Sequence, residues 1–298
     1  MDGVMKHTRS SKVRLSLGDR VFGLVNGFFL VVLLLLILLP LVHMLAVSVS
    51  DANLVLRGEI TFIPSGINFK CYEALLGGSE IPRAYYNTIR YTFFGVLIDV
   101  AMTALCAYPL SRPNFYGRKF FNFFVVFTML FNVGIVANFM IVFQLGLKNT
   151  IWAILLPTAI NVYYMVIMRT FFQNIPEEIY QSAYVDGASD LRIFGQIILP
   201  ISSPVIATMF LFYAVSHWNA YMPALLYLDH KELYPVQLIL RNIVISGTVS
   251  DNATTDTAFM TQGIKYAAIF VTIAPILCVY PFVQKYFTKG IMVGSLKG

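Results

Sequence analysis

The residues of this chain that could support catalysis are few and widely separated. No Gly-x-x-x-x-Gly-Lys-Ser/Thr loop is present to hold nucleotide phosphates, and no Ser-His-Asp or Cys-His arrangement falls in a loop. The histidines and cysteines lack metal-ligand spacing, and the cysteines are odd in number. They are His7, His43, His217, His230, Cys71, Cys106 and Cys278. We therefore expect that this chain is not an enzyme and that it binds no metal or other cofactor itself.

A single acidic residue, Asp99, interrupts the long apolar stretches of the sequence. An ionised side chain inside a bilayer costs on the order of 3 kcal/mol on insertion scales, so such a residue is usually retained for a reason. One reason would be a role in a transport pathway or a proton relay. Another would be a hydrogen bond between packed helices or a position near the membrane surface, and we favour this second interpretation.

Aromatic and amide residues follow His217 in a second apolar stretch. Trp218 and Tyr221 suit a carbohydrate pathway because an aromatic face packs on the C–H side of a sugar ring, and Asn219 suits it because an amide bonds hydroxyls. An interfacial belt of Trp and Tyr explains the aromatic residues equally well. Weaker pathway candidates, which hydrogen bonds between helices would also explain, are Asn132, Asn138, Asn161, Tyr163 and Tyr164.

Membrane-spanning helices must position these residues, because the composition does not suit a soluble protein. The chain is 58% hydrophobic and 12% charged, against about 25% charged residues in ordinary domains. Its mean hydropathy is +0.72. Crossing a hydrocarbon core of roughly 30 Å takes about 20 apolar residues. We expect an all-α polytopic membrane protein with six transmembrane helices, from the nearly charge-free windows 21–49, 91–111, 120–147, 149–168, 204–226 and 266–284.

The first window follows a basic, polar segment, residues 1–20. The hydrophobic run is too long for a signal peptide and lacks a small-residue cleavage site, so we expect it to remain as the first span. It is longer than a straight crossing requires, which predicts tilt or a kink at Pro40. No linker or internal repeat divides the remainder, so residues 21–298 are expected to form one transmembrane domain.

The distribution of Lys and Arg predicts the orientation in the membrane, because cytoplasmic loops retain basic residues. With the N-terminus inside, most of the 21 basic residues fall in cytoplasmic segments close to span ends. Both termini and the loop 174–200 are then cytoplasmic. We attribute the net charge of +6 to this sorting and to attraction for anionic membrane lipid, and not to nucleic-acid binding.

The predicted cytoplasmic loop 174–200 reads as two short helices. Asn174 and Glu177 have capping-box spacing, which predicts a helix start near Ile175. Gly187 is expected to end that helix with a positive φ, and Ser189 to cap the next. The second helix is predicted to end at Pro200 and to share one apolar face formed by Leu191, Phe194, Ile197 and Ile198, with Asp190, Arg192 and Gln196 pointing away.

The stretch from Gln181 to Pro200 resembles the signature of the permeases of bacterial ABC importers: Glu-Ala-Ala, three residues, Gly, nine residues, Ile, one residue, Leu-Pro. The first two positions depart from the pattern, since Gln replaces Glu and Ser replaces Ala. An Asp-Gly-Ala triplet, found in the carbohydrate branch of that family, surrounds the central glycine. The residues that the resemblance assigns to ATPase coupling are Gln181, Ser182, Ala183, Asp186, Gly187, Ala188, Ile197, Leu199 and Pro200.

The resemblance implies a type I importer permease of the maltose type, similar to the branch that handles oligosaccharides and larger glycans. It implies a bacterial cytoplasmic-membrane location and half of a heterodimeric pore completed by a second, related permease. It also implies two ATP-binding subunits that carry ATP and Mg²⁺, with one coupling loop docked in each, and an extracytoplasmic solute-binding protein. The cargo would be a carbohydrate: maltodextrin-like sugars, pectic fragments and acidic polymers such as alginate all fit.

The alternative from another class is a secondary carrier driven by an ion gradient, which would use an intramembrane acid such as Asp99. Carriers of that kind usually show internal repeats and more spans, and neither is visible here. A membrane-bound sensor or scaffold would need a soluble domain, which the sequence does not contain. The sequence leaves open which sugar is carried, and whether this chain or its partner contacts it.

Overall fold

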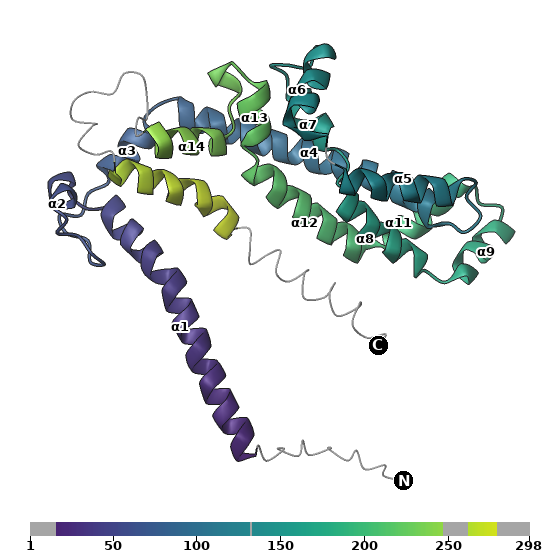
Figure 1. Ribbon diagram of the computed structural model, residues 1–298, viewed down its shortest axis with the longest axis horizontal. Coiled ribbons are helices and arrows are strands. Elements are labelled where there is room, and N and C mark those ends of the chain that lie inside the picture. The colour runs from purple at the N-terminus through teal and green to yellow at the C-terminus, as the bar shows by residue number, and fades with distance from the viewer. Residues whose placement is uncertain (1–15, 132, 247–261, 279–298) are drawn as a thin grey trace, which may run out of the picture.

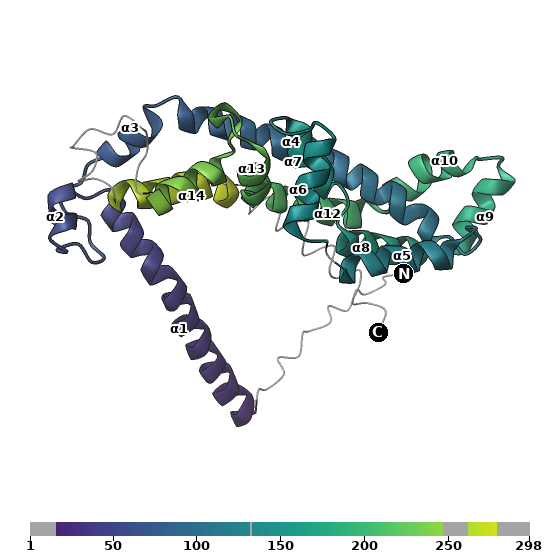
Figure 2. The same ribbon diagram turned by 45° about the horizontal axis from the view of Figure 1, so that its top comes forward.

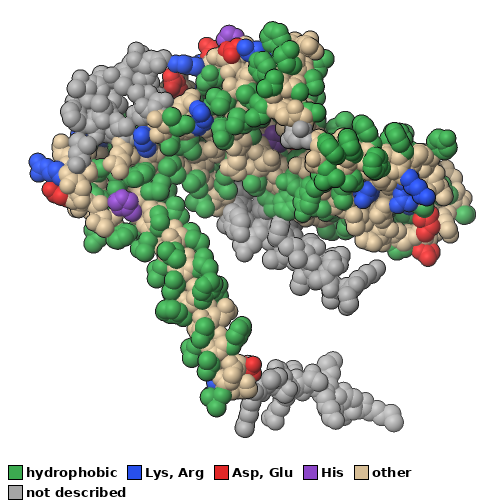
Figure 3. Space-filling model, viewed as in Figure 1, with side chains coloured by type: hydrophobic (Ala, Val, Ile, Leu, Met, Phe, Trp, Pro, Cys, Tyr) green, Lys and Arg blue, Asp and Glu red, His purple; other side chains and the backbone are tan. Residues whose placement is uncertain are grey.

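The computed structural model describes residues 16–131, 133–246 and 262–278, and these residues are helical with no β-strand. The N-terminal helix α1 spans Leu17–Ser48 and projects away from the other helices (Figure 1). It begins with a complete capping box between Ser16 and Asp19 and continues through Pro40. Its apolar side chains are exposed along most of its length (Figure 3), and only its last turn is buried against the protein. Most of the surface of that helix is therefore not covered by other described residues of this chain.

The centre of the fold is α4, Glu80–Ser111, which packs along α12, Ser203–Asn219, and α8, Val162–Gln173. Small and medium apolar residues fill the space between these three helices. The fully buried members of this core include Val96, Ala107, Met165, Met168 and Met209. Because α4 contacts α8 and α12 over several turns, a change in the position of α4 must displace these helices or alter their packing.

Several helices are broken within an apolar stretch. α7, Ile151–Leu155, and the 3₁₀ turn η1, Leu156–Thr158, meet α8 at 51°, and the helix ending at Ile201 meets α12 at 80°. α5, Arg118–Leu130, is followed by α6, Gly134–Gln144. Two helices of the described residues, α1 and α4, are long and apolar enough to cross a bilayer, and up to five are if each bent pair counts as one span. The sixth predicted window, 266–284, is described only as far as Cys278, in the helix Gln262–Cys278.

Short helices surround the N-terminal end of α4. They are α2 (Ala52–Leu56), α3 (Lys70–Leu76), α13 (Met222–Tyr227), η3 (Lys231–Leu233) and α14 (Val236–Ser246). Asn87 of α4 donates to the carbonyls of Glu232 and Tyr234, and Thr88 accepts from the amide of Val236. These bonds fix the segment after α13 to α4.

The remaining short helices lie at the opposite end of α4 (Figure 2). They are α9 (Glu177–Val185), α10 (Asp190–Ile193), the π-helical turn η2 (Phe194–Ile198) and α11 (Leu199–Ile201). Charged side chains of both signs gather near this end in Figure 3. The predicted coupling loop is therefore separated from the α2 and α3 region by the whole length of α4.

Candidate functional site

The first helix of the predicted coupling loop, α9, begins at Glu177, with Pro176 at the N-cap position. The predicted capping box at Asn174 is wrong: no side chain caps α9, and the Asn174 amide bonds to the carbonyl of Phe171 at the end of α8. Proline disfavours helical geometry in the residue before it, so the helix does not begin at Ile175. Glu177 is engaged elsewhere, because its Oε1 lies 2.7 Å from an Arg112 guanidinium nitrogen.

Gly187 ends α9 with a left-handed backbone, as predicted, at φ +75°. The Gly187 amide bonds to the carbonyl of Tyr184 at 3.0 Å, and the Ala188 amide bonds to the carbonyl of Ala183 at 3.0 Å. This pair of bonds is a Schellman cap, which satisfies the last carbonyls of the helix. A Cβ at position 187 would meet no atom within 4 Å. The requirement for glycine there is consequently a requirement of the backbone conformation and not of packing.

The second helix of the loop departs from the predicted apolar face. Ser189 stands at the N-cap position of α10 as predicted, although its side chain makes no cap bond. Ile193, Phe194 and Ile198 are buried, whereas Leu191 is 78% exposed. The cause is the π-turn η2, which widens the helix so that residues five apart, Ile193 and Ile198, share a face. A periodicity of 3.6 residues therefore placed Leu191 on the wrong side.

Pro200 does not end the second helix, contrary to the prediction. The amide of Leu199 bonds back to Phe194, and α11 carries the helix past Pro200 to Ile201. Proline lacks the N–H that an α-helix would use, and a proline near the start of a new helical segment is tolerated. The chain turns instead at Ser202, between α11 and α12.

An arginine at the end of α4 connects α9 to the core. The Arg112 guanidinium lies 3.4 Å from the ring centroid of Tyr180 and pairs with Glu177. A cation over an aromatic face is attracted by the ring quadrupole. One turn earlier on α4, the Tyr108 ring lies 4.8 Å from that of Phe194. Both halves of the loop are thus held on the same end of α4.

The exposed surface of the loop is partly apolar around Gly187. Val185 is 88% exposed and Leu191 is 78% exposed. The Tyr184 hydroxyl donates to Asp190 Oδ1 at 2.6 Å, and this bond raises the pKa of Tyr184, with partial burial as a further cause. Two exposed aliphatic side chains beside a fixed turn form a surface suited to a protein partner.

The structure divides the residues assigned to coupling between the surface and the core. Ala183 is buried, and Ala188, Ile197 and Leu199 are partly buried. The exposed members are Gln181, Ser182, Asp186, Gly187 and Pro200. The Ser182 hydroxyl donates to the carbonyl of Glu178 in its own helix.

A second site lies between α4 and α12, at the acid found in the sequence. Asp99 is 1% exposed, and its Oδ2 lies 2.7 Å from His217 Nε2. Four residues further along α4, Thr103 bonds to the hydroxyl of Tyr213 at 2.7 Å. The two bonds form one ladder because each helix contributes residues four apart, which share a face. Asp99 therefore makes the hydrogen bond between packed helices that we favoured from the sequence.

Gly95 makes room for the histidine. A Cβ at this position would lie 2.5 Å from His217 Nε2, well inside van der Waals contact. Gly95 and Asp99 are one turn apart on α4 and share a face. Gly95 leaves space for the His217 imidazole, and Asp99 forms a hydrogen bond with it. The close approach of α4 to α12 at this level depends on glycine.

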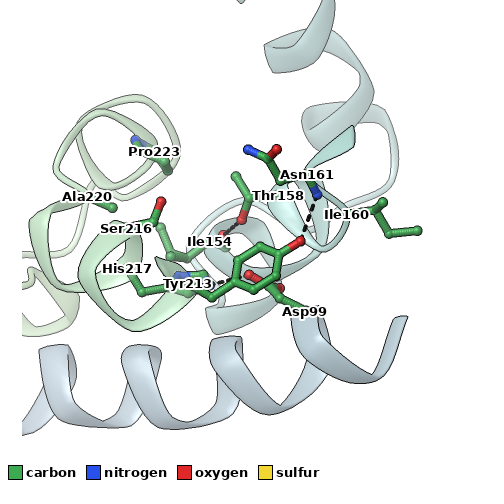
Figure 4. Close-up of a pocket in the computed structure, with 10 residues that line it drawn as sticks. All are labelled: Asp99, Ile154, Thr158, Ile160, Asn161, Tyr213, Ser216, His217, Ala220 and Pro223. Atoms are coloured by element: carbon green, nitrogen blue, oxygen red, sulfur yellow. Dashed lines mark hydrogen bonds and ion pairs between the residues drawn. The ribbon is translucent and has the colours of Figure 1, made fainter. Parts of the chain in front are cut away.

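A cavity of about 170 Å³ opens beside this pair (Figure 4). It lies where α4, α12 and the start of α8 meet. Its lining residues are Asp99, Ile154, Thr158, Ile160, Asn161, Tyr213, Ser216, His217, Ala220 and Pro223. The second carboxylate oxygen of Asp99, Oδ1, is buried and has no hydrogen-bond partner among the described residues. We call this cavity the polar pocket.

The structure does not gather the predicted pathway residues around one cavity. Only Asn161 lines the polar pocket. Trp218 packs near Tyr85, at 6.4 Å between ring centroids, and Asn219 donates to the carbonyl of Val215. The others are exposed or partly exposed, except Asn132, which lies outside the described residues: they are Asn138, Tyr163, Tyr164 and Tyr221.

The sequence analysis missed Tyr213, Thr103 and Ser216. The helical spacing of Asp99 with Thr103, and of Tyr213 with His217, is a signal that could have found the ladder. It could not have shown which two helices carry it, because the pairing joins residues 118 positions apart. Ser216 was not predicted because it is a small residue within an apolar stretch.

Residues 99–293 match the family model for the binding-protein-dependent transport system inner membrane component. The chain belongs to this family. It is 40% identical over 287 residues to the polygalacturonan/rhamnogalacturonan transport system permease protein YtcP of Bacillus subtilis (strain 168), covering 94% of this chain and 99% of that protein. Protein LplC of the same organism is 38% identical over 283 residues, covering 94% of this chain and 96% of LplC.

A solved structure is similar over nearly the whole chain. The crystal structure of a bacterial ABC transporter involved in the import of the acidic polysaccharide alginate contains a chain that superposes with a TM-score of 0.85 at 33% identity, covering 92% of this chain and 99% of that chain. The resemblance drawn from the Gln181–Pro200 spacing is confirmed by these findings. The protein is an ABC importer permease, a transport component with the fold of that family.

Proposed function

We propose that this chain is the permease subunit of an ATP-driven carbohydrate importer and forms half of a heterodimeric pore. Family membership supports the class of transporter. The geometry of the loop 174–200 supports its role in coupling: a Schellman cap fixes the turn at Gly187, and exposed Val185 and Leu191 flank it. The single observation that carries the proposal is this fixed, partly apolar turn at the end of α4 opposite to α2 and α3.

In this proposal, ATP-binding subunits hold the exposed side of α9 and α10. Their closure on ATP moves the loop as a rigid body. The movement reaches α4 through the Arg112 contacts with Glu177 and Tyr180, and reaches α12 through α11. Such a shear between packed helices switches a pore between inward-facing and outward-facing states.

The proposed arrangement in the membrane is that of six spans, including the predicted window 266–284, with both termini and the loop 174–200 in the cytoplasm of a bacterium. The exposed apolar surface of α1 supports contact with lipid or with a second, related permease. Two ATP-binding subunits that hold ATP and Mg²⁺ and an extracytoplasmic solute-binding protein complete the proposed assembly. This chain itself holds no cofactor in the proposal.

The proposed cargo is an oligosaccharide or polysaccharide, including acidic chains such as pectic fragments or alginate. The names of two relatives from Bacillus subtilis (strain 168) support this class: one is a polygalacturonan/rhamnogalacturonan transport system permease, and the other, at 24% identity, is an arabinooligosaccharides transport system permease. The similar solved structure belongs to an alginate importer.

Reconstitution of the complete complex tests this proposal against an ion-driven carrier. The permease pair, its ATP-binding subunits and its binding protein would be placed in proteoliposomes with radiolabelled trigalacturonate or arabinotriose. We expect uptake that needs hydrolysable ATP and continues when ion gradients are collapsed. Uptake that follows an imposed ion gradient without ATP would contradict the proposal and support the carrier.

A further inference from the structure

The polar pocket contains polar groups of which some are already engaged within the protein. The Asp99–His217 bond uses one carboxylate oxygen of Asp99. The Tyr213 hydroxyl bonds to Thr103 and accepts from the backbone amide of Asn161. The side-chain oxygen of Asn161 accepts from the amides of Tyr163 and Tyr164 and so caps α8. Because these atoms are occupied, they are not free to recognise a ligand.

Three polar atoms around the pocket remain without a partner among the described residues. One is the buried carboxylate oxygen Oδ1 of Asp99. The other two, the amide nitrogen Nδ2 of Asn161 and the hydroxyl of Ser216, belong to exposed residues that line the pocket. Asp99 Oδ1 accepts only, Asn161 Nδ2 donates only, and the serine hydroxyl does both. The three residues come from α4, the N-terminus of α8 and α12, and they surround one space in Figure 4.

The mixture of donors and acceptors selects the chemistry of a ligand. A metal ion or Na⁺ would need acceptors throughout, but the Asn161 oxygen is used by the helix cap and its nitrogen can only donate. A carboxylate would need donors throughout and would face the buried acid Asp99. A sugar ring carries hydroxyl groups that donate and accept, so one hydroxyl can give its proton to Asp99 Oδ1 while another accepts from Asn161 Nδ2.

The size of the pocket agrees with a ligand larger than water. Its volume of about 170 Å³ is more than ten times the roughly 10–15 Å³ that one water needs by this measure. Apolar side chains complete the wall, including Ile154, Ile160 and Pro223. A sugar ring combines hydroxyl edges with apolar C–H faces, which matches both parts of this lining.

We propose that the polar pocket binds ring hydroxyls of the transported carbohydrate, so that this permease contacts the cargo itself. The inference rests on the proposed function and deepens it, because it names the part of the cargo that is recognised: the neutral hydroxyl edge and not the acidic group. Asp99 acts as the acceptor, Asn161 as the donor, and His217 holds Asp99 in place.

The test variant is Asn161→Asp in the complete importer. Aspartate caps a helix as well as asparagine does, so the start of α8 is retained while the donor Nδ2 becomes an acceptor. The matched control is Asn53→Asp, an exposed asparagine in the first turn of α2, far from the pocket. Each complex would be assayed for uptake of trigalacturonate and arabinotriose, with free ring hydroxyls and with ring hydroxyls replaced by hydrogen.

We expect the parental complex and the Asn53→Asp control to prefer the free-hydroxyl sugar in kcat/KM by roughly 10- to 100-fold, because the deoxy sugar leaves the donor and the acceptor of the pocket unpaired. The Asn161→Asp complex should lose most of this preference, because the hydroxyl that accepts from Asn161 Nδ2 then has no donor. Ser216→Ala, a variant that removes one hydroxyl and no cap, should lower the preference in the same direction.

Unchanged preference in Asn161→Asp and in Ser216→Ala, in complexes that still transport, would overturn the inference while leaving the proposed function intact. A requirement of the parental complex for Na⁺ that disappears in Asn161→Asp would also overturn it, because the pocket would then hold a cation. If the parental complex transports none of the sugars, the proposed function fails first and this inference fails with it.

Discussion

Gly187 is the residue on which the shape of the coupling loop depends. Its φ of +75° costs an L-residue with a β-carbon roughly 1–2 kcal/mol, and a β-branched side chain more. We expect Gly187→Val to distort the turn and to lower the sugar transported per ATP hydrolysed at least several-fold. Gly187→Asn is the control, since asparagine tolerates the left-handed region and no atom lies within 4 Å of a Cβ there. Parental coupling in the valine variant would contradict this role.

The Tyr184–Asp190 hydrogen bond closes the same turn from outside. The bond raises the pKa of Tyr184, so its contribution is fully present below the unfolded pKa of about 10 and is lost as pH rises through the folded value. Tyr184 is partly exposed, so solvent screening limits the contribution to below about 1 kcal/mol. We expect Tyr184→Phe to speed amide hydrogen exchange at residues 187–190 by no more than about fivefold at neutral pH.

The matched control for Tyr184 is Tyr116→Phe, because Tyr116 is almost fully exposed and lies outside the loop. Its substitution should leave exchange at residues 187–190 unchanged. Equal exchange rates in both variants and in the parental protein would show that the hydroxyl does not stabilise the turn.

At the scale of elements, the crossing of α4 and α12 depends on Gly95. We expect Gly95→Ala to displace His217 from Asp99 and to lower the free energy of unfolding by roughly 1–3 kcal/mol, the usual range for overpacking a core. The thermal midpoint of the purified protein in detergent measures this. Gly27→Ala in α1 is the control: a Cβ there meets nothing within 4 Å. An unchanged midpoint in Gly95→Ala would mean that the crossing adapts without glycine.

The connection between α9 and α4 depends on the planar guanidinium of Arg112. Lysine keeps the charge but loses both the stacking over Tyr180 and the fork geometry. We expect Arg112→Lys to retain expression and ATP hydrolysis and to lower uptake per ATP by about two- to tenfold. Arg57→Lys is the control, since Arg57 is exposed at the end of α2 and lies outside the coupling loop. Equal coupling in both variants would exclude this route.

The sequence predicts those features of the coupling loop that depend only on neighbouring residues in the chain. Gly187 and the position of Ser189 follow from local backbone preferences, and the structure has both. The predicted face containing Leu191 is wrong because the π-turn adds a residue to one turn, which 3.6-residue periodicity does not include. The helix predicted to start near Ile175 begins at Glu177 without the predicted capping box, because proline disfavours helical geometry in the residue before it.

At the scale of the whole molecule, composition predicts a helical membrane protein, and the fixed spacing of one loop predicts the family, which the comparisons confirm. The polar pocket could not be predicted in full, because its residues come from three helices whose packing is not local in sequence. Asp99 and Asn161 were both candidates, but nothing in the sequence joins them. That α1 is exposed along most of its length likewise could not be predicted, because it depends on where the other helices pack.

The most direct test of the account is to change the exposed apolar side chains of the coupling loop, Val185 and Leu191, to aspartate in the reconstituted importer. These side chains contact little within this chain, so the permease should still fold. Uptake of trigalacturonate or arabinotriose and ATP hydrolysis stimulated by the binding protein would be measured in the same proteoliposomes. We predict that both fall to background because the ATP-binding subunits lose their hold on the loop. Uptake and stimulated hydrolysis at parental rates would contradict the central claim that this segment couples ATP hydrolysis to transport.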